Sequence, residues 1–105
     1  AQVLDTGVNS EFYEFNAYVS PDETVLIFTS YGRADDMGRG DLHLSRRRVD
    51  GSWDKAQNLK HLNSDQLDYC PFISPDGKFL YFTTEQAGRK NGNIEMLPFE
   101  TLYYQ

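Results

Sequence analysis

The side chains best suited to chemistry are scattered along this sequence and form no catalytic motif. His43 and His61 stand alone, whereas a zinc site draws its ligands from several His or Cys residues at short spacing. Ser20 and Ser74 each precede a proline and lack the Gly-x-Ser-x-Gly sequence of a nucleophile elbow. We therefore predict no catalytic residue and no metal ligand.

Acidic residues are numerous, but their spacing fits no defined site. Asp35, Asp36 and Asp41 offer too few oxygen ligands, at the wrong spacing, for an EF-hand-type calcium loop. We interpret Asp41 instead as a hydrogen-bonding residue at the start of a strand. Glycoside cleavage needs two carboxyl groups at a defined separation, one with a raised pKa. Nothing in the sequence singles out such a pair, and no cofactor is expected.

Composition narrows the class of protein. The chain has 105 residues, with seven Phe, seven Tyr and one Trp, many beside β-branched residues, and this favours strands. A formal net charge of −6 argues against nucleic-acid binding, which depends on Lys and Arg neutralising phosphates. Arg46, Arg47 and Arg48 would alternate faces in a strand, so we interpret them as a solvated edge. No apolar run approaches the roughly 18 residues of a membrane helix, so membrane insertion is not expected.

Two copies of one repeat make up the chain. Ser20-Pro21-Asp22 recurs as Ser74-Pro75-Asp76, and Leu26-Ile27-Phe28-Thr29-Ser30 recurs as Leu80-Tyr81-Phe82-Thr83-Thr84, each 54 residues later. Three further blocks recur in the same order. They are Asn9-Ser10 with Asn63-Ser64, Gly40-Asp41-Leu42 with Gly92-Asn93-Ile94, and Ala1-Gln2-Val3-Leu4 with Ala56-Gln57-Asn58-Leu59. A fixed period of this kind is typical of repeat architectures.

Each copy is predicted to consist of short strands separated by turns. Pro and Asp favour a tight hairpin after the first strand, and Asp50-Gly51 marks another. No helix is expected, because Pro, Gly and Asp interrupt the chain every eight to twelve residues. Cys70 is the only cysteine, which excludes an internal disulfide. We expect it to be a small buried residue. The expected strands are 15–19, 24–30, 40–47, 52–59, 70–73, 78–84 and 92–97.

These residues resemble the WD40-like Pro-Asp repeats of TolB-like β-propellers. The second copy carries Pro71-Phe72-Ile73-Ser74-Pro75-Asp76-Gly77-Lys78, nearly the full repeat pattern, followed by Leu80-Tyr81-Phe82. The first copy departs from the pattern at Ala17, Glu23 and Thr24. The resemblance covers about residues 9–97 and is specific for the fold but not for function.

The resemblance implies an all-β fold of two four-stranded antiparallel blades within a single unit, residues 1–105. Blade 1 spans about residues 9–59 and blade 2 about residues 63–105. The outer strand of blade 2 is completed either by residues 1–4 of a chain or in cis by Leu102-Tyr103-Tyr104. Two blades cannot close a ring, so either the chain is a piece of a longer protein or several chains assemble. We expect a homo-oligomer, and three chains would give a six-bladed propeller.

Candidate binding residues follow from the same resemblance. Propeller loops gather on one face of the disc, and Glu14 and Asp68 would repeat around the mouth of the central channel, with Arg33 and Arg89 nearby. A ring of carboxylates there would suit a cation or a basic peptide. The simpler interpretation is that loop residues are charged because loops are solvated.

Three interpretations of function stay open. The preferred one is a non-catalytic module that binds a protein, peptide or small ligand, located in the bacterial periplasm or secreted, as the resemblance implies. The second is an enzyme of the glycosidase or lyase type with a polar site in the channel. The third is a structural fragment of an envelope protein. Trp53 is expected to pack between blades, with a carbohydrate-stacking role as the alternative.

Overall fold

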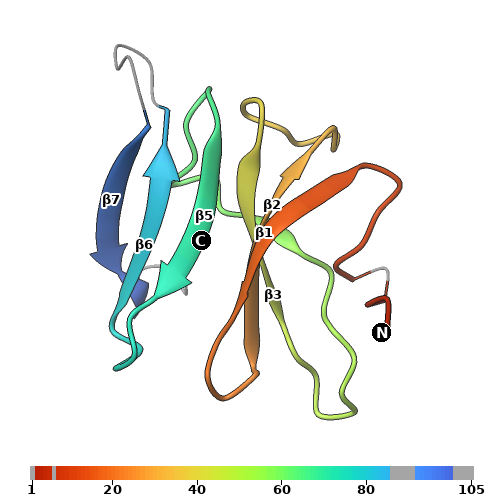
Figure 1. The fold of residues 1–105 in the computed structure, drawn as a ribbon. Coiled ribbons are helices and arrows are strands. Elements are labelled where there is room, and N and C mark those ends of the chain that lie inside the picture. The colour runs from red at the N-terminus through yellow and green to blue at the C-terminus, as the bar shows by residue number, and fades with distance from the viewer. Residues whose placement is uncertain (1, 6, 86–91, 101–105) are drawn as a thin grey trace.

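The computed structural model describes residues 2–5, 7–85 and 92–100, which form two antiparallel sheets side by side (Figure 1). The first sheet has the order β1-β2-β3-β4 and the second the order β5-β6-β7. The all-β prediction is confirmed. The strands are β1 (Tyr13–Val19), β2 (Val25–Tyr31), β3 (Asp41–Arg46), β4 (Gln57–Asn58), β5 (Asp68–Ile73), β6 (Phe79–Thr84) and β7 (Asn93–Pro98).

Corresponding strands of the two sheets pair in the same way. Leu26 lies opposite Val19 in the first sheet, and Leu80 lies opposite Ile73 in the second. Each pair flanks a Ser-Pro-Asp turn, in which the serine hydroxyl donates to the aspartate at 2.6 Å. The predicted Ser-Pro-Asp turns are thus present at the expected residues.

A β-bulge interrupts the first strand of each sheet. Asn16 and Cys70 lie in these bulges with φ of 50° and 54°. A bulge adds a residue to one strand and disrupts the alternation of faces. Cys70 is consequently exposed, and the prediction that it is buried is wrong.

The predicted strand over residues 52–59 is mostly absent. Trp53 makes an isolated bridge to Arg47, and only Gln57–Asn58 pair as β4. Between them the Ala56 N–H donates to the Gly7 carbonyl at 2.8 Å. The predicted strand is therefore interrupted around Ala56, where the N-terminal segment contacts it, although the Asp54 N–H still donates to the Arg46 carbonyl at 2.8 Å.

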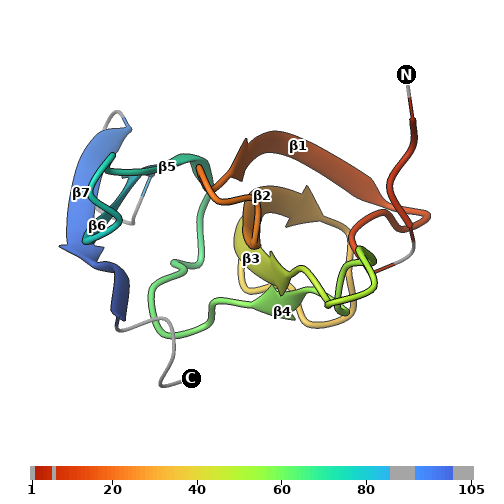
Figure 2. The ribbon, with the colours of Figure 1, turned by 90° about the horizontal axis from the view of Figure 1, so that it is seen from below.

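Two hydrophobic clusters hold the molecule together. The larger joins the facing sides of the sheets, with Ile27, Leu42 and Leu44 of the first sheet against Leu80 and Phe82 of the second. The smaller covers the other side of the first sheet, where Val8, Leu26, Phe28 and Trp53 are buried. Figure 2 shows the N-terminal segment on that outer side, with β7 at the opposite end of the molecule.

The sheets also meet through backbone at one end. The Asp68 N–H donates to the Gly40 carbonyl at 2.9 Å, and the Arg39 N–H donates to the Gln66 carbonyl at 3.1 Å. A Cβ atom on Gly38 would lie 2.0 Å from the Gln66 carbonyl oxygen. Glycine at residue 38 is thus required by the close approach of the two segments.

Candidate functional site

Glu14 and Arg33, two of the four predicted binding residues, bind each other. Glu14 lies in β1 and Arg33 follows β2, and the Arg33 Nη2 atom lies 3.3 Å from Glu14 Oε2 with both side chains mostly buried. Arg33 also donates to Ser30 Oγ and to the Val8 carbonyl, each at 2.7 Å. Its guanidinium group lies over the Phe28 ring at 5.4 Å. Every one of these contacts is internal, which gives Arg33 a structural role.

The electrostatics of Glu14 fit this arrangement. Partial burial acts to raise the pKa of Glu14, but hydrogen bonds from Ser10 and Arg33 outweigh it and hold the pKa below its ordinary value. The carboxylate is therefore ionised and satisfied at neutral pH. It has little remaining capacity for a ligand.

Asp68 occupies the corresponding position in the second sheet and is fully buried. The Ser64 N–H donates to Asp68 Oδ2 at 2.8 Å and the Ser64 hydroxyl at 3.0 Å. Burial raises the pKa of Asp68, opposed by hydrogen bonds from Thr84 and Ser64. This carboxyl group closes the Ser64–Asp68 turn and does not face solvent.

Arg89, the fourth predicted residue, lies outside the described residues. Arg39 and Glu85 form an ion pair at 3.0 Å between the loops of the two sheets. Arg39 is well exposed, so this pair adds little to stability. Ligand binding by Glu14, Asp68, Arg33 and Arg89 stays a prediction.

Buried polar residues surround β3, and the sequence predicted the role of only one of them, Asp41. Asp41 accepts hydrogen bonds from the Met37 N–H at 2.5 Å and from Asn58 Nδ2 at 3.0 Å, which confirms its role at the start of a strand. Asn63 bonds both backbone groups of Leu42, at 2.8 and 2.9 Å. The repeated Asn-Ser dipeptide was a signal for Asn63, whereas Asn58 has valine at the matching position and gives no such signal.

His43 is the one buried histidine among the described residues. Its Nδ1 atom lies 3.0 Å from the Asp41 carbonyl, and its Nε2 atom lies 4.0 Å from Asp35 Oδ1, too far for a direct hydrogen bond. Burial lowers the pKa of His43, and the Arg33 charge adds to this, while the Asp41 carbonyl and the Asp35 and Asp41 carboxylates oppose it. The ring is therefore held neutral against Phe28, at 5.7 Å between ring centroids.

The described residues offer no group of three His, Cys, Asp or Glu side chains arranged to hold a metal ion. They also contain no helix that would be long and apolar enough to cross a membrane.

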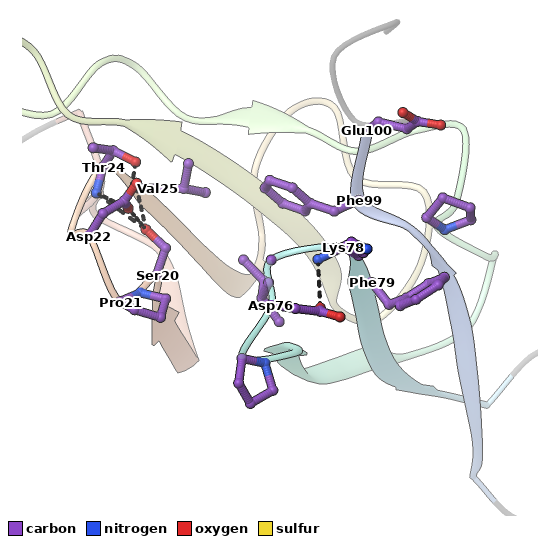
Figure 3. A pocket seen from close by; sticks show the side chains of 14 residues that line it. Ser20, Pro21, Asp22, Thr24, Val25, Asp76, Lys78, Phe79, Phe99 and Glu100 are labelled. Carbon is purple, nitrogen blue, oxygen red and sulfur yellow. Dashed lines mark hydrogen bonds between the residues drawn. The ribbon is translucent and has the colours of Figure 1, made fainter.

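A cavity lies at the end of the sheets away from the predicted binding residues. It has a volume of about 800 Å³ and lies between the two Ser-Pro-Asp turns (Figure 3). Val25, Ile73, Phe79 and Phe99 give it an apolar lining. The charged residues that also line it are Asp22, Asp76, Lys78 and Glu100. Sequence reasoning missed this cavity because its walls come from turns 54 residues apart that only the packing of the sheets brings together.

Trp53 and the arginine run have structural contacts. Trp53 is nearly buried on the outer side of the first sheet, beneath the Arg47 guanidinium group at 5.7 Å. Arg47 lies 3.7 Å from Glu23, and Arg48 lies 2.7 Å from Asp54. The indole therefore packs in the core and offers no open platform for a sugar.

Comparison with known proteins adds no assignment. No family model, curated protein or solved structure matches this chain.

Proposed function

We propose that the chain is a non-catalytic β-propeller module of two blades, completed by self-association, that binds a protein, peptide or small ligand. Each sheet is one blade in this proposal. The TolB-like pattern of the second repeat supports it, together with two adjacent twisted sheets that pack face to face through one apolar cluster.

One observation carries the proposal. Leu42 and Leu44 on β3 are 0% and 2% exposed, because the second sheet covers them. The residues at the matching positions of β7, Ile94 and Met96, are 75% and 53% exposed. A face that is built like a buried one but left open is typical of an interaction surface.

The internal contacts of Glu14, Arg33 and Asp68 leave these residues little capacity either for catalysis or for a ligand. Glu14 and Arg33 neutralise each other, and Asp68 is enclosed by its own turn. A partner would instead meet the exposed loop charges or the apolar cavity between the turns.

Light scattering on the purified chain across a concentration series tests the proposal. We expect a mass near three protomers that persists on dilution, as a closed ring of six blades requires. A stable, folded monomer at all concentrations would contradict self-association.

A further inference from the structure

The N-terminal segment of the chain corresponds to the segment that completes the first sheet. Gln2-Val3-Leu4 matches Gln57-Asn58-Leu59, and Asn9 matches Asn63. The second of these two segments has a binding partner in β3. Its contacts therefore show what the first is suited to bind.

The internal segment is attached to β3 in a defined register. Gln57 lies opposite Leu44 and Asn58 opposite His43, and the Leu59 N–H donates to the Leu42 carbonyl at 2.9 Å. Leu59 is 1% exposed in the cluster between the sheets. These contacts bury both the edge of β3 and the leucine.

The N-terminal segment packs like its counterpart at Val8, but its residues 2–4 pair with no strand. Val8 packs on Leu26 and Phe28, just as Leu62 packs on the cluster that contains Leu80 and Phe82. Val3 and Leu4, in contrast, are 88% and 41% exposed and lie in no strand. The segment is held in place at Val8, but residues 2–4 have no neighbouring strand to pair with.

Strand β7 is an edge of the kind that this segment fits. It pairs with β6 on one side, and the described residues place no strand on its other side. Its exposed Ile94 and Met96 occupy the positions of Leu42 and Leu44. An open edge with exposed apolar residues favours pairing with another chain.

Edge and segment lie at opposite ends of one molecule. Figures 1 and 2 both place β7 at one end and the N-terminal segment beyond the first sheet at the other. The molecule measures 44 Å along its longest axis. One copy therefore cannot use its own segment to cover its own edge, whereas a second copy brings a segment of the right sequence.

We propose that Gln2–Leu4 of one copy add to β7 of a second copy as an antiparallel strand. By the register of β3 and β4, Val3 lies opposite Glu95, Gln2 lies opposite Met96, and the Leu4 N–H donates to the Ile94 carbonyl. Leu4 then covers Ile94 and Met96. This inference rests on the proposed self-association and specifies its contact. The contact is heterologous, so it produces a ring or an open chain of copies.

Disulfide trapping tests the register. Val3 and Glu95 form a pair without mutual backbone hydrogen bonds, for which the Cα atoms lie about 4.5 Å apart, within disulfide range. We would combine Val3→Cys and Glu95→Cys with Cys70→Asn, because Asn16 occupies the matching bulge with a similar φ. Mild oxidation is expected to link copies into covalent oligomers on a non-reducing gel. The control, Val3→Cys with Asn93→Cys, is two residues out of register and is expected to link far more slowly.

Proline substitution tests the hydrogen bond. Leu4→Pro removes the donor to Ile94 and is expected to weaken association at least tenfold, whereas the N–H of Val3 points away from β7, so Val3→Pro serves as the matched control. Both residues are exposed in a single copy, so neither change unfolds it.

Each outcome is informative. Equal linking by both cysteine pairs, linking within one copy, or equal weakening by both prolines would overturn the register. An oligomeric mass without any linking would overturn this contact but leave self-association standing. A monomeric mass by light scattering would remove both proposals.

Discussion

The two sheets have similar sequences and turns but differ in what covers them. The first sheet is enclosed, with Val8 and Trp53 on its outer side, the second sheet on the other and β4 along its edge. The second sheet has one covered side, and among the residues that the structure describes no strand lies beyond β7. The same strand pattern is thus buried in the first sheet and exposed in the second. Burial here depends on the neighbouring segments more than on the strand's own sequence.

Truncating the matching residues Leu42 and Ile94 tests this comparison most strongly. Leu42→Ala is expected to lower the free energy of unfolding by about 2–5 kcal/mol, because it opens a cavity in a filled core. Ile94→Ala is expected to change it by less than about 0.5 kcal/mol in dilute protein, since the side chain is exposed. Urea unfolding at concentrations below self-association measures both. Similar losses would show that Ile94 is covered within a single copy.

The matching asparagines give the next largest difference. Asn63→Ala is expected to cost about 1–3 kcal/mol, because the buried N–H of Leu42 loses its acceptor. Asn9→Ala removes only an exposed bond from Nδ2 to the Leu4 carbonyl and is expected to cost less than about 0.5 kcal/mol. Thermal unfolding compares the two variants. A cost for Asn9→Ala equal to that for Asn63→Ala would mean that the N-terminal segment is already held as firmly as its counterpart.

Sequence reasoning located the strands well because their pattern is local. The Ser-Pro-Asp turns and the runs after them set the ends of β2 and β6 to within a residue. The exposure of Cys70 could not be predicted, because a bulge with positive φ changes which side a residue faces. The short β4 also escaped prediction, since Ala56 bonds to Gly7, almost fifty residues away.

The candidate site was harder to predict than the fold. The sequence suggested that Glu14 and Arg33 lie on one loop face, but it does not show that they bind each other. Ion pairs and side-chain hydrogen bonds join residues of different elements, so they depend on the packing of those elements. The cavity between the turns is a product of packing in the same way.

His43 should make the free energy of unfolding depend on pH through the first sheet only, because the matching position in the second sheet holds Glu95. Burial lowers the pKa of His43 in the folded chain, so the unfolded chain binds the proton more readily. His43 should therefore lower the free energy of unfolding as the pH drops below about 6.5. Asp68 acts in the opposite direction, because its folded pKa is raised and the folded chain takes up its proton more readily. Urea unfolding between pH 7.5 and about 5 measures the slope.

His43→Gln should reduce this slope, whereas His61→Gln, at an exposed residue, should retain it. Glu14 and Asp22, whose pKa values are lowered, lose their contributions only at lower pH, near and below their unfolded pKa values. An unchanged slope in His43→Gln would show that another group controls this pH range.

The smallest difference lies in the hairpin turns, where Glu23 and Gly77 occupy matching positions with φ of 61° and 75°. A side chain is disfavoured at such φ values, so Glu23→Gly is expected to raise the free energy of unfolding by about 0.5–1 kcal/mol. Gly77→Ala is expected to lower it by about 1 kcal/mol, although a Cβ there would meet no atom within 4 Å. The ion pair of Glu23 with Arg47 is exposed and long, so its loss should cost little. Thermal unfolding of the two variants should show shifts of opposite sign, and shifts of the same sign would mean that the turns differ in conformation.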